Sequence, residues 1–219
     1  MNLQQIDLLY LRNHCYLSDP DECFYMLSYT SHRPYTYSED NSIIANLKKD
    51  MCKRGLPEWK YKQQAIDRCA SFLRSINITN IFSDNITIVP IPPSKIRTDP
   101  DHDDRLIQVL NKAFNGTIDI RELITQVHST EADHTTTNRR PPEEIKRNYI
   151  FNEALAVNAK ENIIIFDDVV TTGAHYIAAK EIIQENMPNI ASIKGLFIAR
   201  RVFAEDSDPI NFHSQENLS

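Results

Sequence analysis

The sequence contains little glycine: four residues in 219, at positions 55, 116, 173 and 195. Proteins on average use roughly 7% glycine, so a glycine placed at a turn carries more weight here than usual. A phosphate-binding loop of the Gly-x-x-x-x-Gly-Lys-[Ser/Thr] type requires two glycines five positions apart, and none of the four has such a neighbour. The chain therefore lacks the loop by which P-loop nucleotide hydrolases hold phosphate.

Long apolar runs and an excess of positive charge are also missing. No run approaches the roughly twenty residues that cross a bilayer, and the start, Met1-Asn2-Leu3-Gln4, is not the charged and then apolar beginning of a signal peptide. The formal net charge is −6, whereas nucleic-acid binding draws most of its affinity from Lys and Arg. We therefore expect a soluble, cytoplasmic protein that binds neither a membrane nor nucleic acid.

Cysteine lacks the spacing of a local metal site. The four cysteines, at positions 15, 23, 52 and 69, form no Cys-x-x-Cys pair, which zinc sites built from local pairs require. We expect reduced thiols, some of them buried as small hydrophobic groups.

The most informative segment is residues 162–175, Asn-Ile-Ile-Ile-Phe-Asp-Asp-Val-Val-Thr-Thr-Gly-Ala-His. Its apolar run has the length and β-branched content of a buried parallel strand. Asp167 and Asp168 follow at the carboxyl end of this strand, where open α/β sheets bind ligands. Ionised carboxylates accept hydrogen bonds from sugar hydroxyls or bind a cation.

A helix is expected to begin directly after this strand. The turn before it supplies small and polar residues: Thr171, Thr172, Gly173, Ala174 and His175. Amides at a helix N-terminus, together with the positive end of the helix dipole, favour a phosphate group. Combined with the acid pair, the turn predicts a site for a phosphorylated sugar.

Other proteins also end an apolar strand in paired acids. A Walker B strand would need the glycine-rich loop that the chain lacks. A response-regulator pocket would put the pair near the N-terminus of its domain, whereas only about fifty residues follow Asp168. The simplest alternative is a strand followed by a solvated acidic turn, and the glycine placed at this turn argues against it.

A second segment, residues 87–95, joins a short apolar strand to a loop that contains three prolines. Prolines cannot continue a central ladder, so they force an extended turn. The loop ends in Ser94 and Lys95. An ordinary edge strand ended by proline is the alternative interpretation.

A third segment, residues 128–148, is polar until Ile145 and longer than a compact domain needs. Connections of this length are usually either mobile or functional. The segment contains the basic pair Arg139 and Arg140. A surface loop whose charges serve solubility is the alternative.

Together these segments resemble the type I phosphoribosyltransferases. Residues 162–175 are similar to the ribose-5-phosphate motif of that family: four apolar residues, two acids, two apolar residues, Thr-Thr-Gly-Ala and a final hydroxyl residue. Only His175 departs from the motif. The sequences Val-Pro-Ile-Pro at 89–92 and Arg-Asn-Tyr-Ile-Phe at 147–151 are similar to those of the ComF-like branch. The resemblance covers roughly residues 85–202.

The resemblance implies an α/β fold with the parallel sheet of type I phosphoribosyltransferases and an N-terminal hood. It implies transfer of phosphoribose from phosphoribosyl pyrophosphate to a base or amine, with release of pyrophosphate and with Mg²⁺ as cofactor. Asp167 and Asp168 would hold the ribose hydroxyls and reach the metal only indirectly, through these hydroxyls or water. Residues 171–175 would hold the 5′-phosphate.

The same resemblance implies roles for the other two segments. Ser94 and Lys95 would bind the diphosphate. Lys95, Arg139 and Arg140 would be the catalytic residues, the arginines neutralising the departing diphosphate from a flexible loop that closes over the substrate.

The acceptor stays unidentified. Family members that act on 6-oxopurines carry Asp where this chain has Thr171, which argues against such an acceptor. A second interpretation is a non-catalytic module that senses phosphoribosyl pyrophosphate or a nucleotide and acts through a partner protein. It is favoured by His175 and by the atypical hood. Hydrolysis of a ribosyl bond is a third, and the sequence leaves a homo-oligomer or a protein partner open.

The chain divides into three regions on this interpretation: a hood over residues 1–60, a core over 61–204 and a loose polar tail over 205–219. Apolar patterns along the chain predict the secondary structure. We expect strands at 23–29, 118–127 and 193–199, and helices at 42–48, at 59–73 and around 107–110. Alternating strands and helices predict a parallel sheet.

Overall fold

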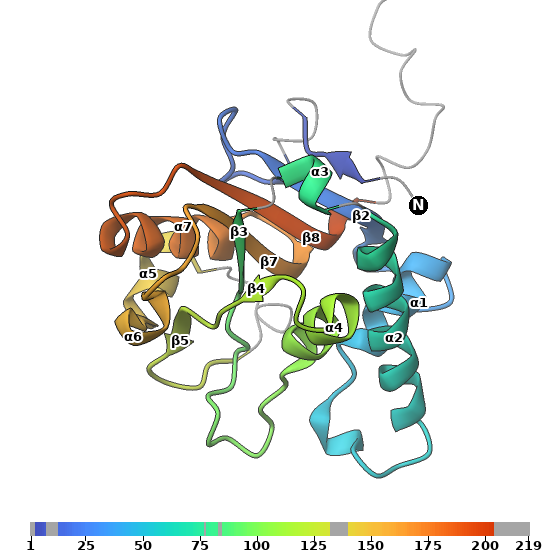
Figure 1. Ribbon diagram of the computed structural model, residues 1–219. Coiled ribbons are helices and arrows are strands. Elements are labelled where there is room, and N and C mark those ends of the chain that lie inside the picture. The colour runs from blue at the N-terminus through green and yellow to red at the C-terminus, as the bar shows by residue number, and fades with distance from the viewer. Residues whose placement is uncertain (1–2, 8–12, 77, 83–84, 132–139, 204–219) are drawn as a thin grey trace, which may run out of the picture.

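The computed structural model describes residues 3–7, 13–76, 78–82, 85–131 and 140–203. A six-stranded sheet runs through the middle of the molecule in the order β1-β2-β8-β7-β3-β4 (Figure 1). Its strands are β1 (Gln4–Gln5), β2 (Cys23–Thr30), β3 (Ile86–Pro90), β4 (Asp119–Ile120), β7 (Asn162–Val170) and β8 (Ser192–Val202). Among the described strand pairs of this sheet, only β1–β2 is antiparallel. The expected α/β fold with a mostly parallel sheet is confirmed.

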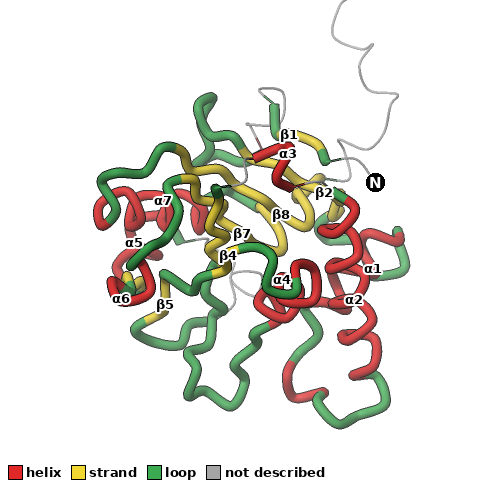
Figure 2. Tube along the Cα trace, viewed as in Figure 1, coloured by secondary structure: helices red, strands yellow, loops and turns green. Residues whose placement is uncertain are grey.

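Helices cover both faces of this sheet, as Figures 1 and 2 show. One side carries α1 (Glu39–Leu47), α2 (Trp59–Ser75) and α4 (Arg105–Phe114), with α3 (Ile78–Phe82) at the upper edge of the view. The other side carries α5 (Pro142–Arg147), α6 (Glu153–Ala156) and α7 (Ala174–Asn186), beside the hairpin of β5 (Ile124–Gln126) and β6 (Tyr149–Phe151). Central strands buried on both faces are apolar almost throughout, and all five residues of β3 are buried.

The pleat of β7 divides the core into two layers. Ile164 and Phe166 pack with α2 and α4, whereas Ile163 and Ile165 pack with α7. Successive side chains of a strand point to opposite faces. Adjacent residues at the end of β7 therefore meet different surroundings, which matters for the acid pair.

The N-terminal region contributes to the main sheet. Strand β2 pairs with β8 from Cys23 to Thr30. Met26 of β2 and Ile44 of α1 belong to the same hydrophobic cluster as Ile164 of β7. The division into a hood and a core at residue 60 stays a prediction, and the predicted tail over 205–219 lies outside the described residues.

The strand expected at 118–127 is divided between two sheets: β4 extends the main sheet, while β5 pairs with β6. Arg121 lies between them, and its guanidinium donates to the backbone oxygens of Leu155 (2.7 Å) and Asn158 (3.0 Å). This polar anchor explains why the apolar pattern does not continue as one strand.

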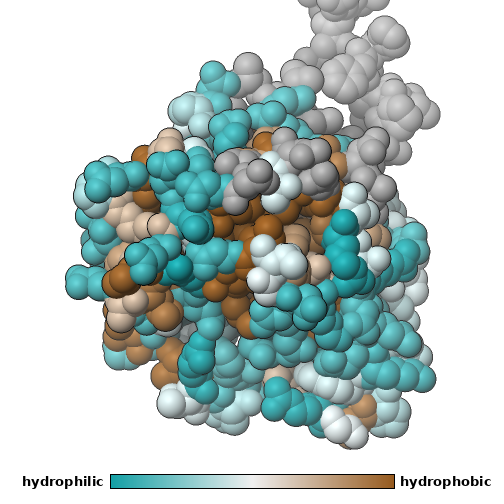
Figure 3. Space-filling view, viewed as in Figure 1, coloured by the Kyte–Doolittle hydropathy of each residue, from teal (hydrophilic) through white to brown (hydrophobic). Residues whose placement is uncertain are grey.

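Figure 3 is a space-filling view from the same side as Figure 1. It shows hydrophobic residues at the middle of the visible face, around the short edge strand β4, and hydrophilic residues over α2. Within the described ranges, none of the helices combines the length and the apolar character needed to cross a bilayer.

Candidate functional site

A cavity of about 480 Å³ lies at the carboxyl ends of β3 and β7. It brings together segments that are far apart in the sequence, because β3 and β7 are parallel neighbours in the sheet. The predicted site residues that line it are Ser94, Lys95, Arg140, Asp167, Asp168, Thr171 and His175. Thr172, Gly173 and Ala174 continue the same turn without lining the cavity, and Arg139 lies outside the described residues.

The turn after β7 is shaped by Gly173. Its φ of +87° lies in the left-handed region, which side chains other than glycine rarely adopt. A Cβ on this residue would also lie 2.6 Å from Cδ2 of Leu17. Glycine is therefore required twice, by the backbone angle and by the close packing, and α7 begins at the next residue.

A short segment near the N-terminus holds this turn from outside the cavity. The amide of Tyr16 donates to the carbonyl of Thr172 at 3.0 Å, and Nδ1 of His14 donates to the carbonyl of Thr171. Burial lowers the pKa of His14 to about 4, so the ring is neutral at pH 7 with a proton on Nδ1. The sequence did not predict this support.

Asp168 is an ionised and buried carboxylate. It is 2% exposed and accepts hydrogen bonds from Nε (2.8 Å) and Nη2 (2.5 Å) of Arg105. Nζ of Lys48 lies 2.9 Å from its other oxygen. Burial opposes ionisation, but the charges and hydrogen bonds of Lys48 and Arg105 outweigh it and hold the pKa of Asp168 well below its usual range.

The charges continue behind Asp168 into the helical layer. Asp103 accepts from Nη1 of Arg105 at 2.9 Å and from Nζ of Lys62 at 2.7 Å. The Lys62 ammonium is 1% exposed and also donates to the backbone oxygens of Leu47 (2.8 Å) and Lys49 (3.0 Å). We call Lys48, Lys62, Asp103, Arg105 and Asp168 the ionic wall of the cavity.

Asp167 has a different setting. Its Oδ1 accepts from the backbone amide of Asp168 at 2.7 Å. Burial, and next the negative charge of Asp168, raise its pKa to about 6, while the neighbouring His175 and Lys48 partly offset this. The two acids are therefore not equivalent, although they are adjacent in the sequence.

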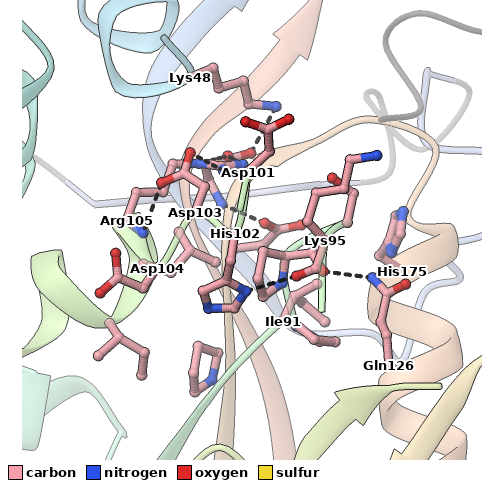
Figure 4. Close-up of a pocket in the computed structure, with 18 of the residues that line it drawn as sticks. Lys48, Ile91, Lys95, Asp101, His102, Asp103, Asp104, Arg105, Gln126 and His175 are labelled. Carbon is pink, nitrogen blue, oxygen red and sulfur yellow. Dashed lines mark hydrogen bonds and ion pairs between the residues drawn. The ribbon is translucent and has the colours of Figure 1, made fainter. Parts of the chain in front are cut away.

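His175 lines the opposite side of the cavity from the ionic wall. Figure 4 shows Lys48, Asp103 and Arg105 on one side and His175 and Gln126 on the other. Nδ1 of His175 lies 2.9 Å from the hydroxyl of Tyr149, at the start of β6. We call Tyr149, Asp167, Thr171 and His175 the polar wall.

The proline loop after β3 is fixed through its backbone oxygens. Nδ1 of His102 donates to the carbonyl of Lys95 and Nε2 of Gln126 donates to that of Pro93, each at 2.8 Å (Figure 4). The amide of Thr130 donates to the carbonyl of Ser94, also at 2.8 Å. These contacts hold Lys95 at the cavity, and sequence patterns did not identify His102 or Gln126.

The polar stretch 128–148 is only partly an irregular loop, because residues 142–147 form α5. Asn148 closes its base: Oδ1 accepts from the amide of His128 at 3.0 Å, and Nδ2 donates to the carbonyl of His128 at 2.9 Å. Arg140 lines the cavity. Residues 132–139 lie outside the described part of the chain, so a lid role for the stretch stays a prediction.

A directly bound metal ion finds no ready set of ligands. In the described part of the chain, no three His, Cys, Asp or Glu side chains are grouped so that they could hold one. Asp168 is already neutralised by two cations. The expectation that the acids would reach Mg²⁺ only through ribose hydroxyls or water stays a prediction.

No family model matches the sequence, and no curated protein matches it either.

Proposed function

We propose that the cavity binds phosphoribosyl pyrophosphate and that the protein transfers its phosphoribosyl group to a base or an amine, releasing pyrophosphate. One observation carries the proposal: the acid pair, Thr171 and His175 at the two ends of the turn, and the loop residues Ser94 and Lys95 line a single cavity. Its volume of about 480 Å³ is in the range of small-molecule sites.

The ligand's three parts match three features of the cavity. Thr171 and His175, which line the cavity on either side of the start of α7, suit the 5′-phosphate, since the amides and dipole of a helix N-terminus favour an anion. Lys95 suits the diphosphate as a cationic donor. Asp167 suits a ribose hydroxyl, which would donate to its carboxylate.

Catalysis would rest on position and charge, because the departing diphosphate is the group that must be stabilised. The proposal assigns two cations of the cavity lining, Lys95 and Arg140, to stabilising the departing diphosphate. Mg²⁺ would be brought by the diphosphate oxygens and would offset their charge. It would meet Asp167 and Asp168 only through water or ribose hydroxyls.

The ion pairs of Asp168 favour a second candidate, a module that binds without turnover. Two protein cations occupy its carboxylate, so a ribose hydroxyl would have to share these oxygens. Such weakened ribose contacts would still suffice for a module that only binds the ligand and signals its presence to a partner protein.

Two measurements test the proposal. Incubation with phosphoribosyl pyrophosphate, Mg²⁺ and a panel of bases and amines should release pyrophosphate. Calorimetric titration should show binding of phosphoribosyl pyrophosphate; binding without release on any acceptor would favour the module, and no binding would reject both.

The role of Lys95 has its own test. We predict that Lys95→Ala weakens binding of phosphoribosyl pyrophosphate about tenfold and that of ribose 5-phosphate much less, because only the former carries a diphosphate. Lys194→Ala is the matched control, since Lys194 pairs with Glu22 at 3.1 Å and does not line the cavity. An equal loss for both ligands would remove Lys95 from the diphosphate site.

A further inference from the structure

His175 and Tyr149 form a contact that connects the start of α7 with the hairpin. His175 is the second residue of α7, and Tyr149 is the first residue of β6. The Tyr149 hydroxyl lies 2.9 Å from Nδ1 of His175. The ring centroids are 6.5 Å apart and the planes are tilted by 40°, so the rings do not stack and the polar atoms make the contact.

The position of Tyr149 is fixed by packing. Its side chain is 6% exposed and belongs to the hydrophobic cluster of Leu123, Ile124 and Ile145. The preceding residue, Asn148, closes the base of the stretch 128–148. The hydroxyl is thus held at the imidazole by the core and by the hairpin.

The direction of this hydrogen bond decides what the imidazole offers to a ligand. A neutral imidazole carries one proton, and the partner of one nitrogen determines which nitrogen holds it. If Tyr149 donates to Nδ1, the proton is on Nε2. His175 lines the cavity and its Nδ1 is directed to Tyr149, so a ligand would contact the ring through Nε2.

We propose that Tyr149 is a positioning residue that donates to Nδ1 of His175 and so makes the neutral imidazole an Nε2–H donor to a phosphate group. This inference rests on the proposed function, which puts a phosphate at the N-terminus of α7. The imidazole would then present an N–H to the phosphate from position 175.

The charged groups around the imidazole are compatible with this role. Asp167 interacts with His175 electrostatically from β7, and Asp168, Lys95 and Arg140 line the same cavity. On α5, Lys146 pairs with Glu181 and Glu185 of α7, further along that helix.

Nuclear magnetic resonance tests the tautomer directly. Long-range ¹H–¹⁵N spectra of the full chain should show one protonated nitrogen, Nε2, and one bare nitrogen, Nδ1, for His175 near pH 8; His175→Gln identifies the signal. In Tyr149→Phe the pattern should change toward a mixture of tautomers. A wild-type ring with its proton on Nδ1, or a pattern unchanged in Tyr149→Phe, would overturn the proposal.

Binding of ribose 5-phosphate and of inorganic phosphate tests the consequence. Tyr149→Phe should weaken binding about twofold if the two tautomers become equally populated, because only rings with the proton on Nε2 donate to the phosphate. His175→Gln, whose amide nitrogen can stand in for Nε2, should bind well, whereas the shorter His175→Asn should not. In the His175→Gln background, Tyr149→Phe should have little further effect.

Tyr25→Phe is the matched control, because Tyr25 is also buried and its hydroxyl donates to Oε1 of Gln4 at 2.7 Å. Unfolding midpoints in urea should show that each variant is folded. If wild type binds ribose 5-phosphate and Tyr149→Phe binds it equally well, the inference about Tyr149 fails while the proposed function stands. If wild type binds no phosphate ligand, the proposed function fails. An equal loss from Tyr149→Phe in both backgrounds would reduce Tyr149 to a packing role and overturn the proposal.

Discussion

The two walls of the cavity hold adjacent residues of one strand by different means. In the ionic wall, Asp168 is buried against Arg105 and Lys48 and is stable as a carboxylate. In the polar wall, Asp167 is held by a backbone amide beside His175 and resists ionisation. One aspartate thus ties helices to the sheet, while the other, on the proposed function, would face the ligand.

This difference has a general cause. A buried charge is stable when several opposite charges and hydrogen bonds satisfy it, and costs free energy when they do not. The pleat sends Asp168 toward α1 and α4, where cations are available, and its neighbour toward the other face. We therefore expect the ionic wall to contribute to folding and the polar wall to respond to the ligand.

The largest effect should come from breaking the ionic wall. We predict that Asp168→Asn lowers the free energy of unfolding by about 3 kcal/mol, because Arg105 and Lys48 would lose the carboxylate that compensates their charge. Urea unfolding at pH 7 measures this. Asp167→Asn is the matched control, and an equal loss in both variants would remove the distinction between the walls.

A smaller effect of opposite sign is expected in the polar wall. The pKa of Asp167 in the folded protein, about 6, is above its ordinary value of 3.8, so the folded state binds this proton more tightly than the unfolded state. Its contribution to stability therefore falls as pH rises from about 4 to 6 and stays low above that. Asp167→Asn removes the ionisation and should stabilise the protein by roughly 1 kcal/mol at pH 7.

The check on Asp167→Asn is its pH dependence. The stability difference from wild type should be small near pH 4 and should grow across the window up to pH 6. Urea unfolding at closely spaced pH values measures it. A difference that is constant with pH would mean that Asp167 ionises as freely in the folded protein as in the unfolded chain.

The smallest effect is predicted for Lys48→Met. The Lys48 side chain is 28% exposed, and Arg105 still makes two hydrogen bonds to Asp168 after its loss. We expect a loss below about 1 kcal/mol, as for ion pairs near the surface. A loss as large as that of Asp168→Asn would show that Lys48, rather than Arg105, is the main support of this carboxylate.

Local patterns predicted one part of this site well. The strand, the turn and the helix at 162–175 are consecutive, so their order, with Asp167 near the strand end and Gly173 at the turn, can be read from sequence. The meeting of Lys95 with the acids also follows from sequence, because parallel strands end at the same edge. Even here β7 continues to Val170, two residues past the acid pair.

The ionic wall could not be predicted in this way. Arg105 is separated from Asp168 by 63 positions, and an ion pair between distant segments leaves no periodic pattern. Lys48 directly follows the short helix α1, and in the sequence it and Lys49 look like ordinary surface charges. The helix α5, in contrast, had signals that were overlooked: Pro142 at its start, acids in its first turn and bases in its last.

The sheet order has a consequence for how the protein is made. Strand β8, formed by residues 192–202, lies between β2 and β7. A chain still emerging from the ribosome cannot join β2 to the rest of the sheet until β8 has been released. Contacts this distant along the chain form slowly. The segment at His14 and Tyr16, which braces the turn after β7, must wait for residues 171–172. The turn after β7, where the proposed function puts the 5′-phosphate, is thus among the last parts of the newly made protein to fold.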